Sequence, residues 1–235
     1  KKALDVINLK PDDLLMVPLF QKEAKEIATL CNIKNIKISF FNNNIRTDFP
    51  TNFIGQDLYQ SGRVAAKLLD ILLKKGHIGI IHIDEDYQNA THLQEKERGF
   101  KSYFNSKKSS NFKFSTINLQ HIGSNNFDEA IIEFLNNNPT INGLFVTISK
   151  SYAVAETLKN SSKHIAIVGY DLVKQNIDFL KQGNIDFLIH QKPKQQIFNG
   201  LSQLAEYFLF DKEIPNQLLL PIDIVNSENI DGYLL

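Results

Sequence analysis

Residues 165–193 read IAIVGYDLVKQNIDFLKQGNIDFLIHQKP, and this stretch predicts a strand, a helix and a second strand. The first apolar run is short, rich in β-branched residues and stops at Gly169, which is typical of a buried strand. Asp171 follows the end of this strand with Tyr170 beside it, and Gln191 follows the end of the next. In an open parallel sheet, ligands bind beyond the carboxyl ends of the strands. The stretch thus predicts a carboxylate and an amide placed to hold a polyhydroxylated ligand.

A plainer interpretation of Asp171 is that it caps the amino end of the helix that follows. Asp is preferred at that position because its carboxylate accepts hydrogen bonds from the first backbone N–H groups of a helix. On spacing alone, the capping interpretation is favoured over the ligand interpretation.

Two segments give the chain a family resemblance. The pattern Gly169-Tyr170-Asp171, a helix and then Gln191-x-Pro193 resembles the lactose-repressor (LacI/GalR) family and its relatives, the type 1 periplasmic sugar-binding proteins. Residues 55–66, GQDLYQSGRVAA, are similar to a second segment of that family. The resemblance covers essentially the whole chain. It implies that Asp171 holds ligand hydroxyls, and that Asp57 and Gln191 lie at hinge crossings and face a cleft. It also implies that Gly62 is a close-packing position and Arg63 a structural charge.

The resemblance implies an α/β fold of two doubly wound parallel-sheet lobes, joined by three hinge crossings. Lobe one is expected to comprise residues 1–57 and 192–213. Lobe two is expected to comprise residues 58–191 and 214–235. The family begins this domain with a strand and a helix that come before Ala3, and we expect both to be missing here, together with the DNA-binding headpiece.

Hydrophobic periodicity predicts alternating helices and strands, which indicates parallel sheets with right-handed crossovers. Helices are expected at 3–9, 21–32, 60–75, 91–104, 126–136, 150–158 and 192–210, besides the one inside the opening stretch. Strands are expected at 14–19, 37–41, 53–55, 78–83, 112–119, 143–148, 165–169 and 186–190, with an extended tail at 214–226.

The resemblance points to further ligand-facing positions at strand ends. Asn42 ends the strand 37–41, where relatives often carry Asp, and a loop Asn that caps a turn is the plainer interpretation. Ser149 follows the strand 143–148, where relatives often carry Asn-Asp, and an N-cap to the next helix is equally favoured. Asp57 also has a capping interpretation.

The segment before Gly99 departs from the family pattern. Relatives place an Arg a few residues before the Gly-Phe pair, aimed at the sugar, whereas Arg98 lies too close to Gly99 to match. The corresponding turn offers instead three polar residues, Asn89, His92 and Gln94. For His92, a surface residue at a helix start is an even alternative. The acidic residues at 84–86 are interpreted as a solvated loop, since they lack the spacing of a calcium-binding loop.

Composition excludes several classes of function. The 235 residues carry no formal net charge and no basic block, so this stretch is not itself an expected nucleic-acid surface. No apolar run reaches the length of a membrane span, and no signal peptide is expected at Lys1. The single cysteine, Cys31, is expected to be buried. The motifs of nucleophilic enzymes, nucleotide-binding loops and zinc proteases do not occur, so we expect no catalytic residue, metal or cofactor.

Two functional hypotheses follow. The first is a cytoplasmic sensor domain of a LacI/GalR-type regulator, in which a small effector, foremost a neutral sugar, closes the lobes. It would act as a homodimer and bind operator DNA through a headpiece outside this chain, without a membrane partner. The alternative is a periplasmic sugar-binding protein of a transporter. An enzyme on the same fold is a remote third hypothesis.

Overall fold

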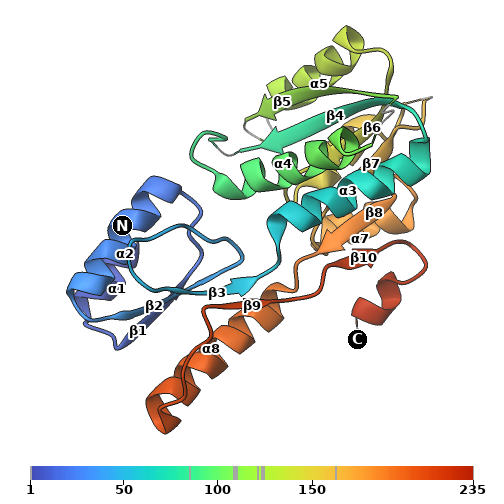
Figure 1. Ribbon diagram of the computed structural model, residues 1–235. Coiled ribbons are helices and arrows are strands. Elements are labelled where there is room, and N and C mark those ends of the chain that lie inside the picture. The colour runs from blue at the N-terminus through green and yellow to red at the C-terminus, as the bar shows by residue number, and fades with distance from the viewer. Residues whose placement is uncertain are drawn as a thin grey trace. The chain divides into compact units, whose positions relative to one another are not determined.

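The computed structural model describes residues 2–84, 86–107, 111–120, 122, 125–161 and 163–234 (Figure 1). The chain divides into two compact units, each described by itself. Unit 1 comprises the residues up to Asp57, Gln88–His92 and Gln191–Pro221, and unit 2 comprises Leu58–Tyr87, Leu93–His190 and the residues from Ile222.

Unit 1 contains a parallel sheet of order β1-β2-β3-β9. Its elements are α1 (Lys2–Asn8), β1 (Asp13–Met16), α2 (Gln21–Ile33), β2 (Lys37–Phe41), β3 (Asn52–Gly55), α8 (Pro193–Phe210) and β9 (Gln217–Leu219). Pro193 begins α8, where its missing N–H costs no helical hydrogen bond. On α2, Ala24, Ala28 and Cys31 recur at helical spacing and are buried, as expected for Cys31.

The tail from residue 214 to residue 221 belongs to unit 1, so its expected place in the second lobe is wrong. β9 pairs in parallel with β3, with Phe53 opposite Gln217. The Asn52 amide nitrogen also donates to the carbonyl oxygens of Ile214 and Pro215, at 3.2 and 3.0 Å. These bonds keep the tail in unit 1 as far as Pro221. The expected lobes are also wrong at Gln191 and at Gln88–His92, since both group with unit 1.

Unit 2 contains a sheet of order β10-β8-β7-β6-β4-β5, in which only β10 runs antiparallel among the described strands. Its strands are β4 (Gly76–Ile83), β5 (Phe112–Leu119), β6 (Ile141–Val146), β7 (Ala166–Tyr170), β8 (Phe187–His190) and β10 (Asp223–Val225). Its helices are α3 (Leu58–Leu73), α4 (Thr91–Asn105, in this unit from Leu93), α5 (Asn125–Asn137), α6 (Ser151–Leu158), α7 (Lys174–Lys181) and the short η1 (Ile230–Tyr233). The predicted α/β class with parallel-sheet lobes is confirmed.

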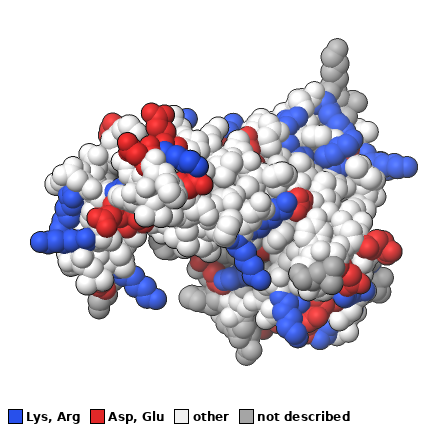
Figure 2. All heavy atoms as spheres, turned by 90° about the horizontal axis from the view of Figure 1, so that it is seen from below, with Lys and Arg blue, Asp and Glu red and all other residues white. Residues whose placement is uncertain are grey.

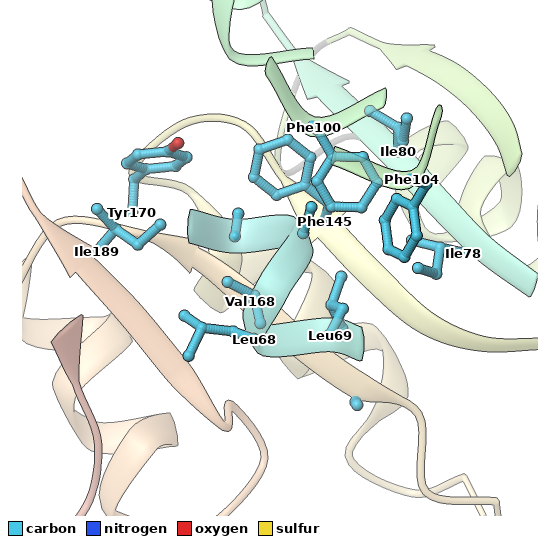
Figure 3. Packing of buried hydrophobic residues seen from close by; sticks show 13 residues of the cluster. Leu68, Leu69, Ile78, Ile80, Phe100, Phe104, Phe145, Val168, Tyr170 and Ile189 are labelled. Carbon is cyan, nitrogen blue, oxygen red and sulfur yellow. The ribbon is translucent and has the colours of Figure 1, made fainter. Parts of the chain in front are cut away.

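Aromatic side chains from α4 and the sheet form the core of unit 2 (Figure 3). The rings of Phe100 and Phe145 stack with centroids 4.5 Å apart and planes 7° apart, and Phe104 packs against Phe100 at 5.5 Å. Full burial of such a side chain contributes about 1.5–3 kcal/mol, and an aromatic pair adds about 0.5–1.5 kcal/mol. This core holds α3 and α4 against one face of the sheet.

Two glycines let α3 and α4 cross closely. A Cβ on Gly62 would lie 1.9 Å from the carbonyl oxygen of Lys96, and a Cβ on Gly99 would lie 1.9 Å from that of Tyr59. Backbone cannot yield at such distances, so both positions require glycine. The expected close-packing role of Gly62 is therefore met by a reciprocal contact with α4.

The surface charge and the helices can be compared with what the composition predicts. On the face that Figure 2 shows, basic and acidic side chains alternate in small groups, in keeping with a formal net charge of zero. None of the helices in the described part of the chain is both long enough and apolar enough to span a membrane.

Candidate functional site

Three polar residues that directly follow strands adopt left-handed backbone conformations. The φ angle is 65° at Asn42 after β2, 56° at Asp84 after β4 and 64° at Asp171 after β7. Side-chain-bearing residues rarely adopt such angles, and Asn and Asp tolerate them best. Backbone strain of this kind concentrates at functional sites. The carboxyl edges of both sheets are therefore the first places to look for binding.

In unit 1, the edge brings together two amides that lie far apart in sequence. The Gln191 amide nitrogen donates to the Asn42 side-chain oxygen at 2.8 Å. The Gln191 backbone oxygen accepts from the Gln196 amide at 2.6 Å, and only 5% of Gln191 is exposed. An amide pair carries donors and acceptors without net charge, which suits ligand hydroxyl groups.

In unit 2, the buried side chain of Asn176 forms hydrogen bonds with the backbone at the ends of two neighbouring strands. Its amide nitrogen donates to the carbonyl oxygens of Ser149, Tyr170 and Asp171 at 2.9, 2.9 and 3.0 Å, and its oxygen accepts from the Tyr152 N–H at 2.7 Å. Two predicted site residues, Ser149 and Asp171, are thus brought together. Sequence reasoning missed Asn176, although its place one turn before Leu180, on the buried face of α7, was a usable signal.

The capping interpretations of Asp171 and Ser149 are wrong. The N-cap of α7 is Val173 and that of α6 is Lys150, and neither of these two residues makes a side-chain cap hydrogen bond. Asp171 instead sits two residues earlier, at the left-handed turn. Asp57 directly precedes α3.

Tyr170 does not line the edge as expected. Its residue is completely buried, its hydroxyl lies 2.9 Å from the Ser61 hydroxyl, and the Lys96 ammonium lies 3.7 Å from its ring centroid. Burial raises the pKa of the Tyr170 phenol. Tyr170 therefore belongs to the core, directly beneath the turn at Asp171.

The three polar residues Asn89, His92 and Gln94 are divided between the two units. The Asn89 amide contacts the start of α2, accepting from the Lys22 N–H at 3.3 Å and donating to Glu23 at 3.2 Å. The Gln94 amide donates to the Tyr87 carbonyl at 2.7 Å. His92 is only 6% exposed, so its surface interpretation is wrong. Asn89 and His92 belong to unit 1, and Gln94 belongs to unit 2.

An ion pair that the sequence did not reveal lies at the edge of unit 2. The Lys150 ammonium is 2.7 Å from an Asp84 carboxylate oxygen, and the two side chains are 34% and 25% exposed. The solvated-loop interpretation therefore fails for Asp84. Glu85, which shared that interpretation, lies outside the described residues.

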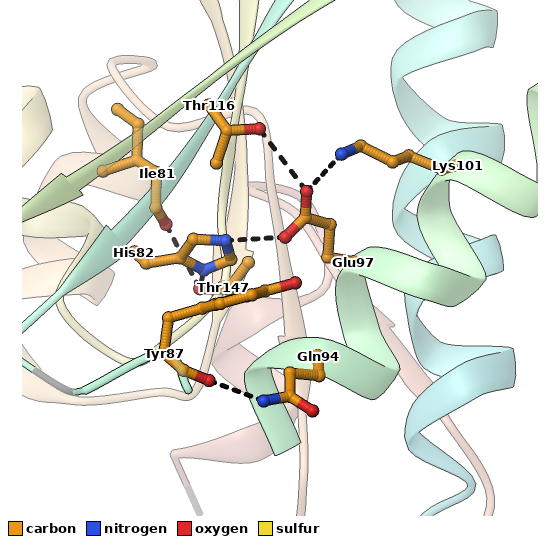
Figure 4. A network of polar contacts seen from close by, with 8 residues as sticks. All are labelled: Ile81, His82, Tyr87, Gln94, Glu97, Lys101, Thr116 and Thr147. Atoms are coloured by element: carbon orange, nitrogen blue, oxygen red, sulfur yellow. Dashed lines mark hydrogen bonds and ion pairs between the residues drawn. The ribbon is translucent and has the colours of Figure 1, made fainter. Parts of the chain in front are cut away.

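A second polar group of unit 2 is buried between α4 and the sheet (Figure 4). The His82 ring contacts Glu97 and Thr147 at 2.9 and 2.8 Å, and Lys101 contacts the other Glu97 oxygen at 2.5 Å. Burial raises the pKa of Glu97, but hydrogen bonds from His82, Lys101 and Tyr87 outweigh it and hold the pKa at about 2. Burial and the Glu97 carboxylate raise the pKa of the Tyr87 phenol. These polar groups satisfy one another inside the protein, so we interpret the network as structural.

No described group of histidine, cysteine and acidic side chains is arranged to hold a metal ion. At both edges, the groups that the structure places can accept and donate hydrogen bonds.

Known proteins resemble the chain in sequence and in fold. The profile of a family described as periplasmic binding protein domain matches residues 3–212. The xylose/arabinose-binding protein XylF of Sulfolobus acidocaldarius is 27% identical, over 85% of this chain and 53% of that protein. The chain thus spans about half the length of this curated relative.

Two solved structures show the same fold. A protein provisionally described as a LacI transcriptional regulator from Bacteroides fragilis is 28% identical, with a TM-score of 0.91 over 99% of this chain and 81% of that one. GanP, a glucose-galactose binding protein from Geobacillus stearothermophilus, is 19% identical, with a TM-score of 0.84 over 97% of this chain and 81% of that one. At that identity, GanP supports the fold alone.

Proposed function

The chain belongs to the periplasmic binding protein domain family, and on that premise we propose that it binds a small neutral carbohydrate as the sensor domain of a LacI/GalR-type transcription regulator. The observation that carries the proposal is the arrangement of Asp171 and Ser149, fixed by the Asn176 amide at the carboxyl edge of the unit 2 sheet. A carboxylate at such an edge accepts hydrogen bonds from ligand hydroxyls.

The amide pair in unit 1 supports the same class of ligand. Asn42 and Gln191 offer donors and acceptors without charge. Arg98, which precedes the Gly99–Phe100 pair, is 61% exposed and contacts Glu95 at 2.6 Å. We therefore propose that the ligand is a neutral mono- or oligosaccharide, bound with help from Asn42, Asp57, Asn89, His92, Gln94, Ser149, Asp171 and Gln191.

Calorimetric titration of the full-length protein with neutral sugars and with sugar phosphates tests this proposal. The neutral panel comprises xylose, arabinose, glucose, galactose and allose. We expect saturable binding of at least one neutral sugar and no tighter binding of any phosphate. Preference for a phosphorylated or carboxylated ligand would contradict the proposal, as would the failure of every sugar to bind.

The regulatory role rests on the similarity to the Bacteroides fragilis protein, which extends over 99% of this chain at 28% identity. A regulator of this type would be a cytoplasmic homodimer, since two-fold operators mirror two-fold proteins. We expect the full-length protein to retard operator DNA from its own upstream region in gel electrophoresis, in a sugar-dependent manner. We also expect light scattering to give the molecular mass of a dimer. A monomer at micromolar concentration with no affinity for that DNA would contradict the regulatory role.

A second candidate is the solute-binding component of a sugar transporter. The observation in its favour is the similarity to the xylose/arabinose-binding protein of Sulfolobus acidocaldarius. The two roles predict different sequences ahead of Lys1 in the gene: a helix-turn-helix for the regulator, and a secretory signal for the transport protein. Sequencing that region and fractionating cells that express the gene would discriminate between them.

A further inference from the structure

The Asp84–Lys150 pair has no part in the function proposed above, yet it lies at the same edge of unit 2. Asp84 follows β4, and Lys150 follows β6, its neighbour in the sheet. The carboxylate and the ammonium are 2.7 Å apart, and each side chain is partly exposed. The pair is thus open to solvent at the edge where ligands of such sheets bind.

The strand register places Asp84 level with Ser149, Lys150 one residue further and Asp171 one residue earlier. Ile81 is paired with Val146, so Asp84 and Ser149 each come three residues beyond a paired position. Phe145 is paired with Val168, and Asp171 comes three residues beyond Val168. Lys150 directly follows Ser149, so the pair and Asp171 lie on the ends of three adjacent strands.

Fold stability does not account for this pair. Ion pairs between partly exposed side chains contribute little to stability, because water screens them. Asp84 nevertheless holds its carboxylate there with a φ of 56°, a conformation that a side-chain-bearing residue rarely adopts. Strain of this kind, without a stability gain, is characteristic of binding residues.

Resting on the proposed function, we infer that Asp84 and Lys150 set the charge preference of the sugar site. The carboxylate and the ammonium neutralise each other at 2.7 Å, so the pair adds no net charge to the edge. A charged sugar would have to break this ion pair to gain from one member, and it would then meet the other member, of like charge, at close range. Both members of the pair still hydrogen-bond to hydroxyl groups, so a neutral sugar is the preferred ligand.

The test separates the two charges in the full-length protein. Asp84→Asn removes the carboxylate and keeps the size, and Lys150→Met removes the ammonium and keeps the length. Calorimetry then compares glucose with glucuronate and glucosamine, galactose with galacturonate and galactosamine, and xylose and arabinose with their aldonic acids. We expect Asp84→Asn to raise the acid-to-neutral affinity ratio about tenfold, and Lys150→Met to raise the amino-to-neutral ratio at least as much.

A matched control uses an ion pair elsewhere in unit 2. The Asp231 carboxylate lies 2.6 Å from the ammonium of Lys181 at the end of α7, so Asp231→Asn also removes the carboxylate partner of a lysine. We expect this variant to keep both affinity ratios of the wild type. The charge-exchanged double variant Asp84→Lys/Lys150→Asp preserves the sum of charges, and we expect it to prefer neutral sugars again.

The outcomes separate this inference from the proposed function. If neutral sugars bind the wild type and both ratios stay unchanged in Asp84→Asn and Lys150→Met, the pair is a surface contact and the inference is overturned. Equal changes in Asp231→Asn would also overturn it, because they would reflect net charge alone. If the wild type binds none of the neutral sugars, the proposed function fails and this inference fails with it.

Discussion

Glu97 and Asp171 are both carboxylates of unit 2, and the structure surrounds them in different ways. Glu97 sits in the regular helix α4, is 5% exposed, and receives hydrogen bonds from the side chains of His82, Lys101 and Tyr87. Asp171 sits at a left-handed turn that is fixed through its backbone by Asn176. Three side chains of the protein satisfy the Glu97 carboxylate, whereas at Asp171 one side chain fixes the turn. Glu97 therefore serves stability, and Asp171 is the better candidate for binding.

The largest expected effect comes from removing the Glu97 carboxylate. Glu97→Ala leaves His82, only 1% exposed, and the Tyr87 hydroxyl without their acceptor. Breaking a buried pair in this way costs about 3–5 kcal/mol. We expect urea denaturation to show a loss of that size, with sugar affinity retained in the folded fraction. Glu95→Ala, on the exposed side of the same helix, is the control and should lose less than about 1 kcal/mol. An equal loss of unfolding free energy in both variants would show that the buried network around Glu97 stabilises the fold no more than the exposed Glu95 contact does.

The pH dependence of stability tests the same carboxylate without a large change of shape. The pKa of Glu97 is about 2 in the folded protein, whereas the ordinary pKa of a glutamate side chain is 4.5. Because the folded pKa is the lower one, the stabilisation is complete above pH 4.5 and is lost as the pH falls from 4.5 to 2. The difference corresponds to about 3 kcal/mol. We expect unfolding free energies of the wild type and Glu97→Gln to converge between pH 5 and pH 2.5. Parallel pH profiles would mean that another group governs acid unfolding.

What the sequence predicted well was local or sterically unique. The short apolar run that ends at Gly169 predicted β7, and the family resemblance predicted a close-packing position at Gly62, which proved to be a helix crossing. The prediction for the tail was wrong because β9 pairs with β3, some 160 residues away in sequence. The three residues of β9, Gln217–Leu219, carry too little periodicity to reveal a partner strand. The helix expected at 60–75 ends at Leu73, because Lys74 takes the left-handed position with a φ of 58°, and Gly76 begins β4.

The site was harder to predict than the fold. Spacing placed Asp171 and Gln191 at strand ends but could not separate binding from capping, because it did not show that α7 begins only at Lys174, after Val173 as its N-cap. Asn176 was missed because a polar residue in a helix is usually solvated, whereas this one bonds three carbonyls inside the protein. The Asp84–Lys150 contact joins residues 66 apart in sequence, and no periodicity relates them.

A smaller effect, on affinity, is expected from Asp171→Ala. A hydrogen bond to a charged group contributes about 1.5–3 kcal/mol, so its loss weakens sugar binding at least about tenfold. Asp171→Asn keeps an acceptor oxygen and tolerates the left-handed φ, so it should lose less affinity than Ala. Calorimetry and melting temperature are measured on the same samples. A lowered melting temperature with unchanged affinity would show that Asp171 has only a structural role, and the main site assignment would be wrong.

The smallest effect is expected from Arg98→Ala. This variant tests whether the arginine that precedes Gly99 in the sequence contacts the ligand. The resembling family places an arginine before its Gly-Phe pair, and Arg98 is the only arginine close to Gly99 in the sequence. Its guanidinium contacts Glu95 at 2.6 Å and lies 4.2 Å from the Tyr59 ring centroid, with 61% of the side chain exposed. An exposed ion pair contributes about 0–1 kcal/mol, so unfolding free energy should change by no more than that. Sugar affinity, measured by calorimetry beside Asp171→Ala, should stay within about twofold of the wild type, since a contact made to Glu95 is not made to a ligand. A tenfold loss of affinity would place Arg98 among the binding residues and would reopen the assignment of a neutral ligand.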